Sequence, residues 1–345
     1  MYSIIKFHPD SRQVDDVQAL TLEGLRFQHT AWTTATTPDG YLERYGGVRY
    51  LLCNTTAAQE TNSCYSEALA CAAGCCGAAP FGGCSLRMAE AAVHIRGSLN
   101  VVVAGCTFTQ LGAWGLALSH GVQHSTVSRN HFYDISGGAL YIGNVNETRL
   151  NSTVPRLSHL MVEDNTIEDI GVEYQGSSGI HLFSATDTTV AHNRLHHTPY
   201  TAITFVWPVP QSESFNRNLS LIGNNVEDPS YWGTDGGAVH TLAQCTDCVL
   251  IGNYFHNQHH GTKCTYIDNT SSGYNISKHV VDTAPQSLWL FYQQSCRPSC
   301  PYEGVNPYPG CNSTSHGKQV FVLSVYCGFA ISHQNGCKRC YRCFR

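Results

Sequence analysis

A short motif recurs along the chain and constrains its fold more than any other feature. An apolar residue is followed three positions later by asparagine, and two positions after that by another apolar residue. Related segments place another residue, such as Cys106 or His279, in the asparagine position. Repeats of this length predict a solenoid, in which each repeat forms one coil. The asparagines follow one another at spacings of 35, 28, 31 and 29 residues: Asn130, Asn165, Asn193, Asn224 and Asn253.

A second pattern follows each copy of the first. Apolar residues alternate along short segments, as in Ile180/Leu182 and Ile203/Phe205, and this two-residue period is typical of a strand with one buried face. No helical period persists over four turns. We therefore predict an all-β, single-stranded, right-handed parallel β-helix of about eight coils, the hand following from the bias of parallel crossover connections. Asparagine suits a recurring turn, because it tolerates left-handed backbone and its amide can hydrogen-bond from coil to coil.

The repeat sets the expected domain limits. Residues 14–292 are predicted to form the β-helix, with a cysteine-rich insertion at residues 33–90 that interrupts the first coil. Residues 293–345 lack the pattern, and we expect an irregular cysteine-rich tail or sequence translated past a wrong splice site. Neither a signal peptide nor a polar cap precedes the first coil, so we expect a truncated or mis-predicted amino terminus.

The cysteines indicate the compartment. Six of the 17 cysteines lie in a Gly/Ala-rich segment, which predicts a disulfide-tied excursion in an oxidising environment: Cys53, Cys64, Cys71, Cys75, Cys76 and Cys84. A zinc cluster is the alternative there, although the segment lacks histidine and paired CxxC spacing. Seven glycosylation sequons also fit secretion: Asn54, Asn146, Asn151, Asn218, Asn269, Asn275 and Asn312. We expect a secreted glycoprotein that holds no metal or cofactor.

Charge and hydropathy argue against two kinds of partner. The net charge is −5 and only 13% of residues are charged, without a basic stripe, which argues against nucleic acid. No apolar run reaches the length that spans a membrane. We expect a monomer that binds neither.

The alternation also predicts one outward-facing column of side chains. If Ile180 and Leu182 point inward, His181 points outward, and stacked coils about 4.8 Å apart bring its equivalents within reach of one another. The column could be an ordinary polar surface, but its histidines and tyrosines favour a ligand-contacting groove. Trp207 and Trp232, in longer turns nearby, could stack on a sugar ring or simply cover the coil edge. The column comprises His94, Ala117, Tyr141, His181, Thr204, His240 and Tyr266.

Two carboxylates lie beside this column. Asp235 precedes the strand that bears His240, and Asp268 ends the strand that bears Tyr266 in the next coil. One acting as acid and the other as base or nucleophile, about 5 to 9.5 Å apart, could hydrolyse a glycoside. We expect Asp268, beside the bulky Tyr266 and Ile267, to be the acid. Both could instead be turn residues, since Asp-Gly and Asp-Asn are ordinary turn signals. The acidic residues that recur just after the asparagine position are interpreted as structural: Asp134, Glu168, Asp169 and Asp228.

Four segments in fixed order carry a family resemblance: FQHTAW at 27–32, AAVHI at 91–95, TDGGAVHTL at 234–242 and YIDNTSS at 266–272. Over roughly residues 14–292 the chain resembles the right-handed parallel β-helix proteins of the pectate-lyase-like superfamily. Within that superfamily it resembles the glycoside hydrolase family 141 type. The resemblance implies catalytic carboxylates in the last two segments, which are Asp235 and Asp268 here. The chain departs from the family by having Asn269 where glutamate is frequent, so one helper carboxylate is missing.

These observations favour a secreted glycoside hydrolase that acts on a polysaccharide or oligosaccharide. Asp235 and Asp268 are the expected catalytic residues. One alternative is a non-catalytic carbohydrate-binding or surface β-helix. Another is a polysaccharide lyase or epimerase, which needs a calcium-binding acidic cluster or a Lys/Arg base on a strand face, and the outward column has neither. The residues expected to bind substrate are His181, Thr204, Trp207, Trp232, His240 and Tyr266.

Overall fold

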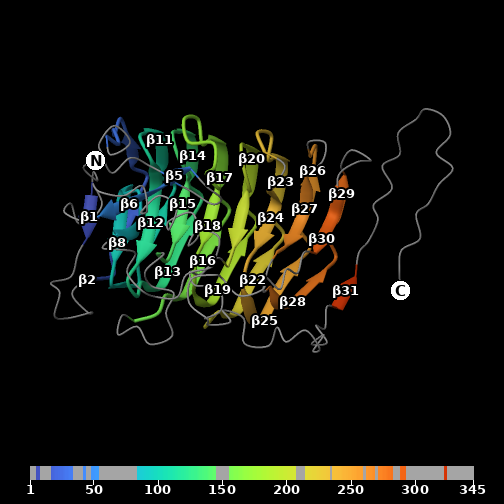
Figure 1. The fold of residues 1–345 in the computed structure, drawn as a ribbon. Helices are drawn as coiled ribbons and strands as arrows, with labels where there is room; N and C mark the ends of the chain where they lie inside the picture. Colours follow the sequence, from blue (N-terminus) through green and yellow to red (C-terminus); the bar gives the residue numbers. More distant parts are fainter. Residues whose placement is uncertain are drawn as a thin grey trace.

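The computed structural model describes residues 5–7, 17–33, 42–43, 48–53, 84–144, 155–206, 214–233, 235–258, 262–268, 271–282, 288–292 and 322–324. Within these residues the chain forms strands and no helix, and it winds into an elongated solenoid whose coils follow one another in sequence order (Figure 1). Three long parallel sheets form its faces. The predicted all-β, right-handed parallel β-helix is confirmed.

Sheet A carries the outward column. It has nine strands among the described residues: β1 (Ile5–Phe7), β8 (Ala91–Arg96), β12 (Trp114–Ser119), β15 (Leu140–Ile142), β18 (Ile180–Leu182), β21 (Ile203–Phe205), β24 (Gly237–Thr241), β27 (Lys263–Ile267) and β30 (Leu288–Tyr292). Six of these strands coincide with the alternating segments of the sequence, because side chains of alternate parity reach the core and the outer face.

Sheets B and C complete each coil. Sheet B contains β2 (Val17–Gln18), β3 (Thr21–Glu23), β9 (Ser98–Leu99), β10 (Val102–Ala104), β13 (Gln123–Ser128), β16 (Ser158–Glu163), β19 (Thr186–Ala191), β22 (Arg217–Ile222), β25 (Gln244–Ile251), β28 (Ser272–Ser277) and β31 (Val322–Ser324). Sheet C contains β4 (Arg26–Gln28), β11 (Thr107–Leu111), β14 (His131–Ile135), β17 (Thr166–Ile170), β20 (Arg194–Thr198), β23 (Asn225–Pro229), β26 (Tyr254–His256) and β29 (Val280–Asp282). From β12 onward each described full coil has one strand in every sheet, whereas the coil that begins with β8 has two strands, β9 and β10, in sheet B. The sequence indicated at least two strands in each coil.

The core runs the length of the solenoid as one hydrophobic cluster. It includes the inward members of sheet A, such as Ile180, Ile203 and Val239, each with no exposed surface. Phenylalanines also stack from coil to coil, with 4.9 Å between the ring centroids of Phe27 and Phe108. Because identical positions stack on one another, each coil buries its apolar face against its neighbours.

The repeated asparagines form a ladder of buried side chains at the turn between sheets B and C, as predicted. The amide nitrogen of Asn165 donates to Oδ1 of Asn193 at 2.9 Å, and that of Asn193 donates to Oδ1 of Asn224 at 3.0 Å. Each of these oxygens also accepts the backbone N–H of the preceding ladder asparagine. The asparagine ladder therefore satisfies buried backbone groups as well as its own amides. Its members are Asn130, Asn165, Asn193, Asn224 and Asn253.

The ladder ends in two different residues. At its start, the backbone N–H of Cys106 donates to Oδ1 of Asn130 at 2.9 Å. At its other end, the backbone N–H of Asn253 donates to Nδ1 of His279 at 3.1 Å. Cys106 and His279 are the residues that the sequence repeat places in the asparagine position. The motif therefore predicted both ends of the ladder as well as its asparagines.

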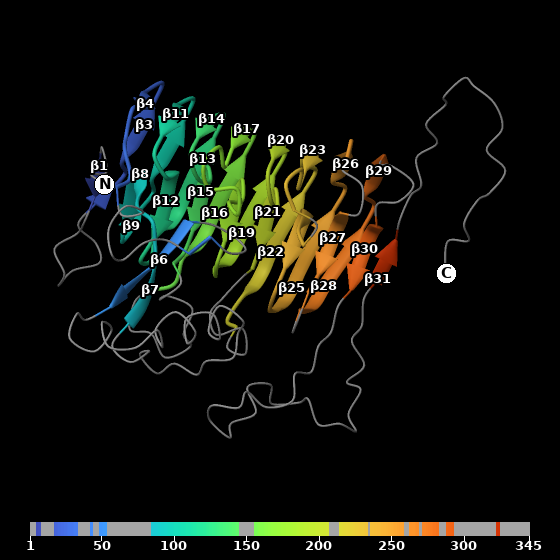
Figure 2. The same cartoon turned by 45° about the horizontal axis from the view of Figure 1, so that its top comes forward.

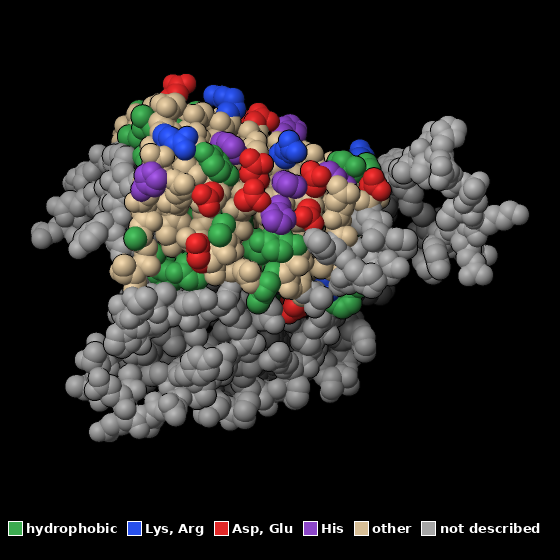
Figure 3. All heavy atoms as spheres, turned by 90° about the horizontal axis from the view of Figure 1, so that it is seen from above, with side chains coloured by type: hydrophobic (Ala, Val, Ile, Leu, Met, Phe, Trp, Pro, Cys, Tyr) green, Lys and Arg blue, Asp and Glu red, His purple; other side chains and the backbone are tan. Residues whose placement is uncertain are grey.

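The acidic residues after the ladder were interpreted as turn residues, but the structure places them within strands β14, β17 and β23 of sheet C. Asp134, Asp169 and Asp228 have φ values of 52°, 48° and 52°, in the left-handed region that aspartate tolerates. Beside them, register places Glu168, His196, Glu227 and His256 in one column of sheet C. Figure 3 shows acidic and histidine side chains gathered on this face. The side chain of Glu168 is held by a histidine of the same sheet, because its Oε1 lies 2.7 Å from Nε2 of His131.

Strands occur beyond both expected limits of the β-helix. β1 pairs with β8 in sheet A before residue 14, and β31 pairs with β28 in sheet B after residue 292. A small antiparallel sheet of β5 (Leu42–Glu43), β6 (Val48–Cys53) and β7 (Cys84–Met88) lies beside the first coils (Figure 2). Its register sets the backbone of Cys53 opposite that of Cys84. The disulfides predicted for residues 53–84 depend on side chains outside the described part of the chain, and they stay a prediction.

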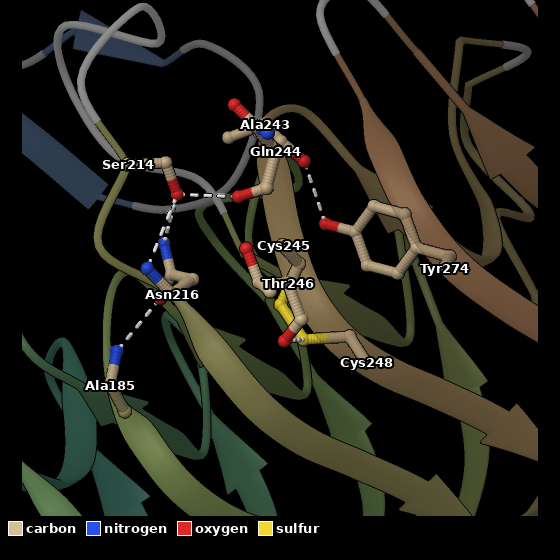
Figure 4. The surroundings of a disulfide bond; sticks show 9 residues. All are labelled: Ala185, Ser214, Asn216, Ala243, Gln244, Cys245, Thr246, Cys248 and Tyr274. Atoms are coloured by element: carbon tan, nitrogen blue, oxygen red, sulfur yellow. Dashed lines mark hydrogen bonds between the residues drawn. A yellow bond between two sulfur atoms is a disulfide. The ribbon is translucent and has the colours of Figure 1, made fainter. Parts of the chain in front are cut away.

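A disulfide joins Cys245 and Cys248 on β25 (Figure 4). The pairing of β25 with β28 shifts register between Gln244 and Cys248, so the disulfide closes a bulge. Gly273, at φ +80°, lies opposite the bulge, where a Cβ would overlap the carbonyl oxygen of Cys245. No pattern in the sequence singled out these two cysteines. No helix in the described part of the chain is long and apolar enough to cross a membrane.

Candidate active site

Register in sheet A aligns the outward column as the two-residue period predicts. Tyr141 pairs with His181, His181 with Thr204, Thr204 with His240, and His240 with Tyr266. The column nevertheless does not form an open groove along its length. His181 and Thr204 have no exposed surface, and His240 and Tyr266 are 2% exposed. Alternation predicted the side of the sheet correctly, but it carries no information about what covers that side.

The amino-terminal half of the column is packed as a second hydrophobic cluster. Trp32, Trp114, Tyr141 and Phe183 belong to it. The Trp114 and Tyr141 rings meet edge to face at 5.2 Å, and the His181 ring lies 4.0 Å from that of Phe183. His181 is thus packed against aromatic rings and has no exposed surface, and its role as a substrate contact stays a prediction.

The carboxy-terminal half of the column is polar. The rings of His240 and Tyr266 stack with centroids 4.2 Å apart and 6° between planes. Oδ2 of Asp268 lies 3.2 Å from Nε2 of His240. On the other side of the ring pair, Nζ of Lys263 lies 3.5 Å from Oδ1 of Asp235. The structure therefore brings both predicted aspartates close to the stacked rings, although Asp235 precedes β24 and Asp268 follows β27.

Two residues that the sequence did not single out complete this site. Nζ of Lys263 lies 3.5 Å from Oδ1 of Asp235 and 4.3 Å from the centroid of the Tyr266 ring. The hydroxyl of Tyr200 lies 3.3 Å from Nδ1 of His240. We call Asp235, His240, Lys263, Tyr266 and Asp268 the carboxylate cluster.

Burial sets the protonation of the two stacked rings. Loss of solvent lowers the pKa of His240, against the opposing effect of Asp268, so the imidazole is neutral near pH 7. Its Nε2–H can then donate to Asp268 while Nδ1 accepts from the Tyr200 hydroxyl. Burial, followed by the charges of Asp268 and Asp235, raises the pKa of Tyr266 far above its usual range. Tyr266 therefore keeps its phenolic proton.

The carboxylate cluster reaches solvent at one end. The side chain of Asp235 is 52% exposed, whereas that of Lys263 is 12% and that of Asp268 is 10% exposed. Trp232, 56% exposed, lies three residues before Asp235 in the same turn, and its backbone N–H donates to the carbonyl of Pro199. A ligand would approach from this side. Trp207 and Asn269 lie outside the described residues.

The described side chains include no group of three or more His, Cys, Asp or Glu residues arranged to hold a metal ion. The carboxylate cluster has one amine, one imidazole and one phenol around its two carboxylates. These groups can donate, accept and share protons, which is the chemistry of general acid–base catalysis.

Comparison with known proteins identifies the fold. No protein-family model and no curated protein matches the chain. A solved structure described as a glycoside hydrolase matches 81% of this chain and 47% of its own, with a TM-score of 0.63 and 18% identity. DFA-IIIase from Arthrobacter chlorophenolicus A6 without its lid matches 60% of this chain and 49% of its own, with a TM-score of 0.41 and 15% identity. An alginate lyase from Paenibacillus sp. str. FPU-7 matches 59% of this chain and 75% of its own, with a TM-score of 0.36 and 13% identity.

The chain thus spans about half the length of the glycoside hydrolase that it matches. At 18% identity, this likeness shows a shared parallel β-helix fold. Since such folds host several unrelated activities, function must be argued from the site itself.

Proposed function

We propose that this protein is a secreted glycoside hydrolase that cleaves a linkage in a polysaccharide or oligosaccharide. The observation that carries the proposal is the placement of Asp235 and Asp268, from neighbouring coils, around the stacked rings of His240 and Tyr266: Asp268 contacts His240, and Asp235 contacts the Lys263 amine that lies over Tyr266. The fold shared with a solved glycoside hydrolase and the resemblance of both aspartate motifs to the family 141 type support it.

The surroundings of the two carboxyls suggest different roles. Asp235 is half exposed, and its Oδ1 lies 3.5 Å from Nζ of Lys263. Asp268 is largely buried beside the uncharged ring of His240. We therefore assign Asp268 as the general acid and Asp235 as the base or nucleophile.

In this scheme Asp268 gives its proton to the glycosidic oxygen as the bond from that oxygen to the anomeric carbon breaks. Asp235 then takes a proton from the water that attacks the anomeric carbon, which inverts its configuration. In the retaining course Asp235 attacks the carbon itself, and water later releases the sugar from the ester. Both courses need the same two residues.

Substrate contact is assigned to the exposed end of the cluster. Trp232 offers an open aromatic face on which a sugar ring can stack. His240 and Tyr266 would contact the sugar only at the reacting bond. His181 and Thr204 are left out of the contact surface, because neither has exposed area. Trp207 stays a prediction.

Lys263 bears on the alternative of a polysaccharide lyase. The outward column alone offered no amine base, but the structure places Nζ of Lys263 in the cluster. An amine base needs a free lone pair directed at the substrate, whereas Nζ of Lys263 forms an ion pair with Asp235 at 3.5 Å and is largely buried. The two carboxyls remain the better placed pair for catalysis, so the hydrolase is preferred.

The test is hydrolysis of a glycan panel by the wild type and by Asp235→Asn and Asp268→Asn. Each variant should lose about 10²- to 10⁴-fold in turnover, the usual contribution of a positioned acid or base. Asp228→Asn is the matched control, because asparagine tolerates its left-handed backbone at φ 52°. Wild-type turnover in both site variants would refute the assignment. Glycan binding by the wild type without any hydrolysis would favour a binding module.

A further inference from the structure

The imidazole of His240 lies between two oxygen atoms, and the mechanism proposed above gives neither ring nitrogen a role. Nδ1 lies 3.3 Å from the hydroxyl of Tyr200, and Nε2 lies 3.2 Å from Oδ2 of Asp268. We propose that Tyr200 is a positioning residue whose hydroxyl donates to Nδ1 and so places the ring proton of His240 on Nε2. Nε2–H then holds Oδ2 of Asp268, and Oδ1 carries the proton that the acid gives to the substrate. The catalytic meaning of this inference rests on the proposed function.

The direction of the two hydrogen bonds follows from the groups themselves. A neutral imidazole donates through one ring nitrogen and accepts through the other, so the two contacts of His240 run in the same direction. Either Tyr200 donates to His240 and His240 donates to Asp268, or both bonds are reversed. In the reversed arrangement the carboxyl would commit its own proton to Nε2. In the arrangement that we propose, Oδ2 only accepts and the acidic proton stays on Oδ1, because a protonated carboxyl retains acceptor capacity.

The hydrogen-bond chain requires a neutral imidazole, and burial provides it. His240 is 2% exposed, and its burial lowers the pKa of the ring despite the opposing effect of Asp268. Among the other charged groups, Asp235 raises this pKa and Lys263 lowers it, so their effects oppose each other. A protonated ring would have to donate through both nitrogens, and Nδ1 could then accept nothing from the Tyr200 hydroxyl.

Packing holds both rings of the chain in place. The His240 ring stacks on Tyr266 with centroids 4.2 Å apart, and the Tyr200 ring meets it edge to face at 6.5 Å between centroids. Tyr200 is 3% exposed, and its carbonyl oxygen accepts both the backbone N–H and the hydroxyl of Ser230 at 2.9 Å. Gly236 leaves room for the Tyr200 ring, because a Cβ there would lie 3.0 Å from its Cε2 atom. Tyr200→Phe would therefore keep the ring contacts and remove the hydroxyl alone.

The first test needs no substrate, because it measures the tautomer of His240. The ¹⁵N chemical shifts of a neutral imidazole distinguish the nitrogen that carries the proton from the one that does not. The His240 resonances are assigned by their absence from His240→Gln. In the wild type near pH 7, Nε2 should carry the proton. In Tyr200→Phe the ratio of the Nε2–H form to the Nδ1–H form should fall by about 5-fold, the contribution of one hydrogen bond, because Nδ1 loses its donor.

Tyr254→Phe is the matched control for this measurement. Tyr254 stacks on His256 at 4.3 Å between ring centroids, so the variant also removes a hydroxyl from a tyrosine beside a histidine, but on sheet C. Its His240 shifts should be those of the wild type. A wild-type ring with its proton on Nδ1 would overturn the proposal, and this measurement decides it even if Tyr200→Phe does not fold. An unchanged tautomer ratio in a folded Tyr200→Phe would overturn it as well.

The second test is kinetic and uses any glycan that the wild type hydrolyses. Tyr200→Phe should lower kcat by about 10-fold with KM nearly kept, because the acid loses its orientation while the substrate keeps its contacts. A raised KM with unchanged kcat would contradict a role in positioning the acid. If no glycan is hydrolysed but the tautomer ratio changes as expected, the proposed function fails while the hydrogen-bond chain stands. If Asp235→Asn and Asp268→Asn are inactive and Tyr200→Phe keeps the wild-type kcat, the function stands and this inference fails.

Discussion

Replacing His279 with asparagine tests how the asparagine ladder ends. His279 is 4% exposed, and its Nδ1 accepts the backbone N–H of Asn253, so the ring is neutral with its proton on Nε2. That Nε2 has no hydrogen-bond partner among the described residues. An asparagine would instead present Oδ1 to both the backbone and the side-chain N–H groups of Asn253, as in the other rungs.

The magnitude follows from the cost of charging the ring. Burial lowers the pKa of His279 from 6.5 to about 4, so the unfolded chain binds a proton more readily than the folded one. Stability from this group is complete above pH 6.5 and is lost as the pH falls toward 4. The full loss is about 3 kcal/mol, and about 2 kcal/mol is already lost at pH 5. His240 adds a loss of the same sign, but it does so in both proteins and cancels in the comparison.

Urea unfolding at pH 7.5 and pH 5 gives the comparison. Between pH 7.5 and pH 5, the free energy of unfolding should fall by about 2 kcal/mol less in His279→Asn than in the wild type. At pH 7.5 the variant should be more stable than the wild type by about 1 kcal/mol, because it gains one hydrogen bond. His192→Asn, at an exposed histidine with φ 55°, controls for removal of an imidazole. Equal losses in His279→Asn and the wild type would show that the ring is not held neutral at the ladder's end.

Three further predictions concern the frame around the site, and urea unfolding measures each of them. Asn193→Ala removes the side chain that bonds the backbone N–H of Asn165 and the carbonyl of Val162. It should lower the free energy of unfolding by about 3 kcal/mol, and a loss under about 1 kcal/mol would contradict this expectation. Gly237→Ala should destabilise the fold because its Cβ would overlap the carbonyl of Lys263, whereas Gly233→Ala, with nothing within 4 Å, should be neutral. Replacing both Cys245 and Cys248 with alanine should lower the free energy of unfolding by about 2 kcal/mol, the chain-entropy value for so short a loop, and unchanged stability would exclude this role.

Periodicity explains why so much of the fold could be predicted. Stacked coils repeat the same geometry, so the spacing of Asn193 from Asn165 and Asn224 is enough to predict its structural role. The same logic placed His240 and Tyr266 on one face, since parity along a strand decides which side a Cβ takes. Two aspartates beside that face could then be expected to meet.

The two-residue period did not predict the positions of side chains that are long, that lie in turns, or that other parts of the chain cover. Lys263 has the parity of the inward Thr265, but its four-carbon stem carries Nζ to the ring of Tyr266. Tyr200 lies in a turn, where no period operates, and so its contact with His240 left no signal. Burial of His181 and Thr204 depends on long-range packing that a two-residue pattern does not encode.

The ladder has a direction, and that direction bears on how the molecule can change its length. Each rung offers an acceptor to the coil before it and a donor to the coil after it, as Asn193 does between Asn165 and Asn224. Any interior coil can therefore be duplicated or deleted without leaving a mismatched amide. The terminal coils are not interchangeable in this way, because Cys106 supplies only a donor and His279 only an acceptor to the chain of amides. Gene duplication within the interior would lengthen the solenoid while the carboxylate cluster, built by two adjacent coils, moves as a unit.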